Sequence, residues 1–257
     1  MHADTATYVY CLVGGDRPPS GGDVPQGLSE MQPARLLEIE PRLFAVVADA
    51  PLERYSAEAI AEGLADIDWV SARAVEHEAV VEYFLTAGTV VPMKLFTLFS
   101  SDDRALADLR GRSAAIRDVL RTIERRREWG VRVLRGRRPS PAVGAADATA
   151  PTSGTAFLVR KKRERDELRE AATRARERGD AVFAELLAFA DDARRREPAA
   201  GEPTSKVVLD AAFLVAESET AGFREALERA RAALAREGLE VALTGPWPAY
   251  HFVEETP

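Results

Sequence analysis

Histidine, cysteine and paired carboxylates are the residues of this chain whose types could support catalysis or metal binding. The chain has only three histidines and one cysteine. His77-Glu78 begins like an HExxH zinc helix, but Val81 stands where the second histidine would be. His2, His77 and His251 lack the spacing of a recognisable metal-ligand set. We therefore expect no metal, no cofactor and no catalytic residue, and we expect His77 to lie on a helix face among acidic neighbours.

Cys11 and the acidic pairs allow a similar conclusion. Cys11 lies in an apolar strand-like stretch, where a free cysteine usually behaves as a small buried hydrophobe. The acidic pairs at 102–103, 191–192 and 254–255 fall at expected helix ends, linkers or the terminus, where solvated acids are the default. The sequence contains neither a GxxxxGK[ST] phosphate loop nor a GxSxG elbow. None of these residues identifies an enzyme.

Composition and charge exclude several further classes of protein. Charged residues make up 30% of the 257 positions, and no apolar run approaches the roughly 20 residues of a membrane span. A net charge of −7 argues against nucleic-acid binding through bulk electrostatics. One cysteine excludes an internal disulfide framework, and the polar first six residues lack a secretory signal. We expect a cytoplasmic globular protein without nucleic-acid or membrane partners.

Hydrophobic patterns predict the elements that would position any site. In the first half we expect strands at 7–13, 34–39 and 43–48, helices at 57–66, 68–86 and 102–127, and an apolar strand at 89–99. Pro92 forbids a continuous central strand in the last of these, so we expect it to be interrupted or turned there.

The second half predicts long helices between strands. We expect strands at 128–135, 206–215, 239–243 and 250–253, a rigid turn at 245–248, and helices from 155 onwards and at 220–237. The long helix carries a heptad seam from Leu168 to Ala193, although Gly179 could split it into two. Segments 136–154 and 197–205 are rich in Pro, Gly or small residues, so we expect them to be flexible loops.

This order of elements predicts an α+β fold of two domains, 1–127 and 128–257, each a sheet with its own helices. The residue patterns identify no active site in either domain.

Several segments, in order, resemble one family: TYVYCLV, HEAVVEYFLTAGTVVPMKLFTLF, EWGVRVLR, GTAFLVRKKRE, AAFLV and LTGPWPAYHFVE. They are similar to the gas vesicle protein F/L family (GvpF/GvpL), accessory proteins of gas vesicle assembly. The likeness covers nearly the whole chain apart from the two linkers and the first loop, and the closing GPWPxYxFV is its most specific piece. Two positions depart from the family pattern: Phe96 stands where glycine is usual, and Ala249 where a second proline is common.

The resemblance implies a modified ferredoxin-like N-terminal domain, a C-terminal domain of a sheet with long helices, and a non-enzymatic role. Such proteins resemble binders or chaperones of the hydrophobic shell protein that forms the vesicle wall, with other accessory proteins as further candidate partners. A binder could cover an exposed shell subunit by adding an edge strand or by offering an apolar face. Whether the chain belongs to the F-like or the L-like branch stays open.

Two groups of residues follow as candidates. Candidate partner-binding residues lie in two apolar strands, although each also fits an ordinary core: Tyr8, Tyr10, Val90, Met93, Lys94, Phe96 and Thr97. A structural motif that locks the C-terminal sheet is expected from Trp129, Gly245, Pro246, Trp247, Pro248 and Tyr250. Two other functions stay open: a small-molecule binder or enzyme on a ferredoxin-like scaffold, with a pocket around His77 or Cys11, and a helical adaptor that uses the heptad seam.

Overall fold

The chain divides into two compact units, each described here by itself. The computed structural model describes residues 5–15, 24–86, 88–136, 154–197 and 206–253. Unit 1 comprises Met1–Arg127 with Trp247–Pro257, and unit 2 comprises Glu128–Pro246. The expected loops at 136–154 and 197–205 lie almost wholly outside the described residues.

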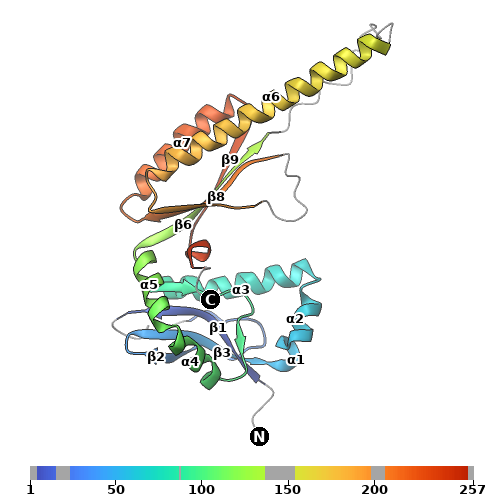
Figure 1. Ribbon diagram of the computed structural model, residues 1–257. Coiled ribbons are helices and arrows are strands. Elements are labelled where there is room, and N and C mark those ends of the chain that lie inside the picture. The colour runs from blue at the N-terminus through green and yellow to red at the C-terminus, as the bar shows by residue number, and fades with distance from the viewer. Residues whose placement is uncertain (1–4, 16–23, 87, 137–153, 198–205, 254–257) are drawn as a thin grey trace. The chain divides into compact units, whose positions relative to one another are not determined.

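Unit 1 is built on an antiparallel sheet (Figure 1). Its strands are β1 (Thr5–Gly14), β2 (Arg35–Glu40), β3 (Leu43–Pro51), β4 (Thr89–Pro92) and β5 (Leu98–Phe99). The order is β2-β3-β1-β4, with β5 also pairing with β1. This order and these directions are those of a ferredoxin-like β-α-β-β-α-β sheet, except that the described residues between β1 and β2 form no helix. The expected α+β class and the modified ferredoxin-like sheet are confirmed.

Helices cover both faces of this sheet. They are α1 (Leu52–Tyr55), α2 (Ala57–Gly63), α3 (Ile67–Leu85), α4 (Asp102–Gly111) and α5 (Ser113–Ile123). Successive strand side chains point to opposite faces. On β1, Tyr8 contacts His77 of α3, while Thr7 donates to Asp102 of α4 at 2.7 Å. The helix α3 therefore lies on one face and α4 on the other.

Pro92 interrupts the apolar stretch as expected. β4 ends at Pro92, opposite Cys11, and the chain turns through residues 93–97 before β5 pairs with Thr7 and Tyr8. Both short strands pair with β1, so β1 is a central strand.

The prediction of one helix over 102–127 is wrong. The helix breaks at Arg112, whose φ of −111° and ψ of 7° are not helical, and restarts at Ser113. Gly111 precedes this break, and glycine has the weakest helix propensity after proline. The arginines expected in its last turn instead lead into β6 (Arg126–Arg135).

Unit 2 is a second antiparallel sheet with two helices packed on one face (Figure 1). Its elements are β6, β7 (Asp192–Arg195), β8 (Val207–Ala216), β9 (Leu239–Trp247), α6 (Gly154–Leu187) and α7 (Thr220–Ala235), with strand order β7-β8-β6-β9. Its core gathers buried residues of α6, α7 and three strands around Trp129, Phe213 and Phe223. Strand β7 was not predicted from the sequence.

The helix α6 is continuous through Gly179. A Cβ atom at this position would lie 2.9 Å from Cγ1 of Val208 on β8, so glycine allows α6 to approach the sheet closely. Gly179 therefore serves packing rather than a helix end.

The C-terminal segment differs from the prediction in two ways. Gly245, Pro246 and Trp247 end β9, with a cis peptide bond between the first two, and residues 250–252 form a 3₁₀ turn instead of a strand. The last residues also group with unit 1 rather than with the expected domain 128–257. The physical reason is a tertiary contact, because the Tyr250 hydroxyl donates to a carboxylate oxygen of Glu78 on α3.

Candidate functional site

The candidate partner-binding residues divide into core and surface. Tyr8 and Tyr10 are 0% exposed and Val90 is 2% exposed, because β1 lies between β3 and β4 and both faces of the sheet are covered. These three side chains belong to the core of the folded unit, so the expectation that they contact a partner is wrong. The other candidates lie in the turn at 93–97, where Met93, Phe96 and Thr97 are half-buried and Lys94 is exposed.

A buried polar network holds this turn against the sheet. His77 Nε2 lies 3.1 Å from the Met93 carbonyl oxygen, and Nδ1 lies 2.7 Å from the Tyr8 hydroxyl. A carbonyl only accepts, so Nε2 carries the proton and Nδ1 accepts from Tyr8. The Tyr8 oxygen in turn accepts from the Phe96 amide at 3.3 Å. Both ring nitrogens of His77 thus have partners, and two of the three bonds end in the turn.

The environment keeps this histidine neutral. His77 is 3% exposed rather than on an open helix face among acids, which corrects the sequence-based expectation. Burial lowers its pKa to about 4, against a smaller opposing effect of the bond to Met93. Burial likewise raises the pKa of the Tyr8 hydroxyl, so Tyr8 stays protonated. The pair acts as a neutral clamp, with no charge available for acid–base chemistry.

Phe96 occupies a backbone conformation that glycine normally supplies. Its φ is 65°, in the left-handed region that costs most side chains about 1–2 kcal/mol. The family that the sequence resembles usually has glycine at this position. The Phe96 ring stacks on Trp69 of α3, with centroids 5.3 Å apart and planes 19° apart. The stack and the clamp both hold the strained residue, and strain of this kind often collects at functional sites.

Substitutions at Phe96 are therefore expected to rank in an unusual order. Phe96→Ala loses the aromatic stack and keeps the left-handed strain, whereas Phe96→Gly loses the stack and removes the strain. We expect Phe96→Gly to be more stable than Phe96→Ala by about 1 kcal/mol, the reverse of the order in an ordinary element. Urea unfolding of both variants and of the unaltered chain measures this difference. Equal stabilities, or a more stable alanine variant, would mean that residue 96 does not require positive φ.

Two large apolar residues are exposed at the junction of α2 and α3, close in sequence to Trp69 of the stack. Leu64 is 57% exposed and Ile67 is 74% exposed. A Cβ atom at Gly63 would lie 2.7 Å from the Trp69 ring, so the indole lies directly over this glycine. We call Leu64, Ile67, Trp69 and Phe96 the hydrophobic corner. Its residues come from the end of α2, the first turn of α3 and the 93–97 turn, and the Gly63–Trp69 and Trp69–Phe96 contacts link these three elements.

Of the corner residues, only Phe96 is among the candidates predicted from the sequence. Ile67 stands three residues before Val70 and continues the helical spacing of the apolar positions of α3, yet it is 74% exposed. The Asp66 carboxylate caps α3 by accepting from the amides of Asp68 and Trp69 at 2.9 and 3.3 Å. That cap fixes where Ile67 and Trp69 emerge from the helix.

Asp102, which was expected to be a solvated acid, instead forms a cluster of hydrogen bonds that joins parts of the fold. Asp102 receives both terminal nitrogens of the Arg35 guanidinium at 2.9 Å, and Asp49 accepts from the same group. The Arg35 guanidinium lowers the pKa of Asp102. This cluster ties α4 to β1, β2 and β3 and has no catalytic geometry.

Cys11, His77 and the surface hollows do not come together as an enzyme or small-molecule site in the described residues. Cys11 is buried as expected, and its burial raises the pKa of the thiol. Two surface hollows lie along α6 and along α7, and neither contains His77 or Cys11. In the described part of the chain, no three metal-ligating side chains come together, and no helix is long and apolar enough to cross a membrane.

The two tryptophans of the expected structural motif differ in their exposure to solvent. Trp129 is 5% exposed and packs beside Phe223 in the core of unit 2. Trp247 is 38% exposed, so it joins the candidates for surface contact rather than the core. Pro248 is buried, and Tyr250 anchors the C-terminal segment to α3 as described above.

The whole chain is similar to known gas vesicle proteins. It is 30% identical to gas vesicle protein L of Streptomyces sp. (strain CB03234), with 98% of this chain and 94% of the relative covered. It is 28% identical to gas vesicle protein L2 of Halobacterium salinarum (96% and 91% covered) and 26% identical to gas vesicle protein F of the same Streptomyces strain (97% and 100% covered). The likeness thus extends to both the L and the F branch.

Solved structures share the fold. The crystal structure of GvpF from Anabaena sp. PCC7120 superposes with a TM-score of 0.69 at 18% identity, covering 97% of this chain and 96% of that one. GvpF from Microcystis aeruginosa gives a TM-score of 0.66 at 16% identity, with 96% and 98% covered. The model of the family described as "Gas vesicle synthesis protein GvpL/GvpF" matches residues 6–254. The resemblance seen in the sequence is therefore confirmed, and the chain belongs to the GvpL/GvpF family of gas vesicle synthesis proteins.

Proposed function

We propose that this protein acts in the cytoplasm as a non-enzymatic assembly factor that binds the hydrophobic gas vesicle shell protein and limits its aggregation. Family membership supports a role in gas vesicle assembly. The single observation that carries the finer proposal is the hydrophobic corner, in which exposed Leu64 and Ile67 lie at the α2–α3 junction that also holds the Trp69–Phe96 stack. The Tyr8–His77–Met93 clamp holds the turn that carries Phe96 against the sheet.

The corner suits an apolar subunit awaiting polymerisation. Leu64 and Ile67 leave much of their surface in water, which costs free energy until a partner covers them. Aromatic side chains that are already packed, like the Trp69–Phe96 pair, lose little rotamer freedom on binding. A preorganised apolar surface of this kind can therefore cover apolar surface on a shell subunit. Met93, Lys94 and Thr97 surround it as secondary contacts.

At the β4 and β5 edge, which the sequence suggested for strand addition, the geometry favours an apolar face instead. β4 has four residues and β5 has two, and Val90, Val91 and Pro92 are buried. Short, covered edges offer few backbone groups to an incoming strand. The corner, in contrast, projects side chains from the surface.

Deleting the gene tests the proposed role in the cell. We expect the deletion strain to form few or misshapen gas vesicles and to lose buoyancy, with no change in growth on defined media. Electron microscopy of whole cells measures vesicle number and shape. Re-introduction of the intact gene is the control and should restore both. Vesicles of normal number and shape in the deletion strain, with no second family member expressed, would contradict the proposal.

A further inference from the structure

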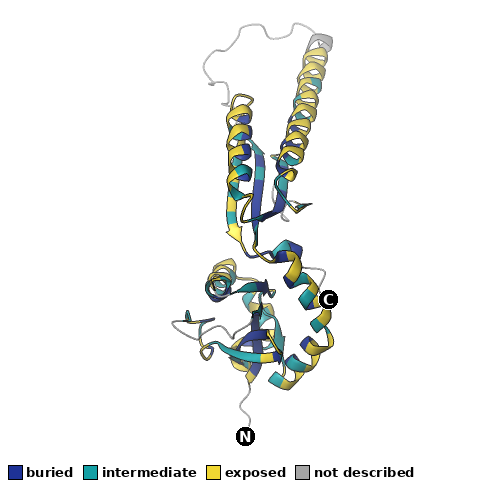
Figure 2. Cartoon of the chain, turned by 90° about the vertical axis from the view of Figure 1, so that its left-hand side faces the viewer, coloured by how far each residue is buried: buried dark blue, intermediate teal, exposed yellow. Residues whose placement is uncertain are grey.

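Residues 157–170 of α6 extend beyond the sheet and beyond α7, and all of them except the half-buried Asp166 are exposed (Figures 1 and 2). Four large apolar residues in this segment are exposed: Phe157 (43%), Leu158 (67%), Val159 (48%) and Leu168 (56%). An apolar helix surface without a covering layer usually marks an interaction site. The gas vesicle function proposed above does not use this segment.

The exposed segment continues a seam that is already packed further along the same helix. In the C-terminal half of α6, Ala175, Gly179, Val182 and Leu186 recur at alternating spacings of four and three and are buried in unit 2. The same spacing extends backwards through exposed and half-buried positions, in the order Ala172, Leu168, Arg165, Lys161 and Leu158. One side of one continuous helix is thus a packing seam, and only part of it has a partner.

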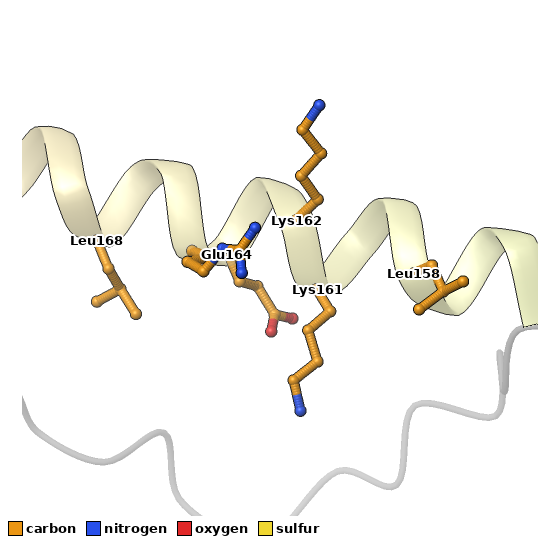
Figure 3. A pocket seen from close by; sticks show the side chains of 6 residues that line it. Leu158, Lys161, Lys162, Glu164 and Leu168 are labelled. Atoms are coloured by element: carbon orange, nitrogen blue, oxygen red, sulfur yellow. The ribbon is translucent and has the colours of Figure 1, made fainter.

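The unpartnered part of the seam has a defined charge pattern. Two cations, Lys161 and Arg165, stand between two leucines, Leu158 and Leu168. Figure 3 shows Leu158, Lys161 and Leu168 on one side of the helix and Lys162 directed away from it. All four, with Glu164 and Arg165, line the surface hollow along this segment. Like charges four residues apart destabilise an isolated helix, so the pattern is costly unless an anion meets it.

Two neighbouring acids, one of them the hollow-lining Glu164, pair with other cations of the helix. Glu164 lies 3.7 Å from Arg160, and Glu170 lies 3.6 Å from Arg174, both outside the seam. Within the described residues, neither Lys161 nor Arg165 forms an ion pair. The ammonium of Lys161 instead lies 5.8 Å from the Phe157 ring centroid.

A second copy of this chain is a poor occupant of the seam. An antiparallel pairing that matches Leu158 with Leu168 of the other copy sets Lys161 against Arg165 of that copy. A parallel pairing sets each cation against its own equivalent. Both arrangements place like charges inside the interface, which costs free energy.

We propose that residues 158–172 of α6 bind an acidic amphipathic helix of a partner protein. The complementary helix carries apolar residues that meet Leu158 and Leu168, and two carboxylates between them that meet Lys161 and Arg165. This is the helix-in-groove mode of recognition, with charge setting the register. The site lies in unit 2 and is independent of the hydrophobic corner.

A synthetic helical peptide with the pattern Leu-x₂-Glu-x₃-Glu-x₂-Leu provides the probe. Fluorescence anisotropy of the labelled peptide with the full chain is expected to show saturable, salt-sensitive binding. Lys161→Glu with Arg165→Glu should weaken binding at least tenfold. Arg163→Glu with Arg174→Glu changes the net charge equally, but both residues are exposed on the other side of α6 and neither lines the hollow, so this variant should weaken binding less than threefold. A peptide with lysines in place of its glutamates should bind the Lys161→Glu/Arg165→Glu variant.

Three results would overturn the proposal. The first is no saturable binding of the acidic peptide to the unaltered chain. The second is an equal loss of binding in the on-seam and off-seam variants, which would indicate diffuse electrostatic attraction. The third is a dimer of the unaltered chain in sedimentation that Leu158→Ser with Leu168→Ser abolishes, because the seam would then belong to a second copy. The readouts need no shell protein, so failure here is distinguishable from failure of the proposed assembly function.

Discussion

Lowering the pH from 7 to 5 is expected to destabilise unit 1 by about 2 kcal/mol through His77 alone. The folded-state pKa of His77 is lowered to about 4, against an ordinary value near 6.5. Between these values the unfolded chain binds a proton at His77 and the folded chain does not. Stability from this group is therefore present above pH 6.5 and is lost as the pH falls towards 4. The Asp102 pKa is also lowered, and its contribution falls in the same direction at more acidic pH.

His77→Gln isolates the contribution of the histidine. Glutamine retains a donor and an acceptor for the Met93 carbonyl and the Tyr8 hydroxyl, but it does not titrate. We expect a lower stability at pH 7 and a difference between pH 7 and pH 5 that is smaller by about 2 kcal/mol. Urea unfolding at pH 7, 6 and 5 measures both quantities. An unchanged pH dependence in the glutamine variant would show that another group is responsible.

Much of the fold follows from local sequence patterns. Residues 7–13 are β-branched and aromatic, and they form the central strand β1. Pro92 lacks a backbone donor, and the apolar stretch around it divides into β4 and β5 as predicted. Such signals are local, because a few neighbouring residues determine them.

Long-range contacts could not be predicted in the same way. The return of the C-terminal segment to unit 1 depends on a hydrogen bond from Tyr250 to Glu78, which lie 172 positions apart. Nothing in the pattern around either residue identifies its partner. Strand β7 has two arginines in its four residues and lacks the apolar signature of a strand, so its pairing with β8 was also missed.

The candidate site was predicted only in part, for a reason of geometry. Composition marks Tyr8, Tyr10 and Phe96 alike as aromatic and apolar. The order of the sheet decides that the two tyrosines lie in the core, while the turn after Pro92 brings Phe96 to the surface against Trp69. A single sequence does not supply that order.

Loss of shell-protein binding in Ile67→Lys is the second large effect that we expect. A lysine at the hydrophobic corner would have to be desolvated in an apolar interface, so binding should fall at least tenfold, or about 1.4 kcal/mol or more. Val75→Lys provides a matched control. Val75 is also β-branched, lies on the same helix and is 69% exposed, compared with 74% for Ile67. It lies eight residues further along α3, about 12 Å away.

Aggregation of the shell protein measures the central proposal most directly. Shell protein is diluted from denaturant into buffer with an equimolar amount of the full chain, and light scattering follows its aggregation. The unaltered chain and Val75→Lys are expected to suppress the scattering, whereas Ile67→Lys, shown by circular dichroism to be folded, is not. Equal suppression by all three proteins would contradict binding through the hydrophobic corner, and suppression by none of them would contradict the proposed function itself.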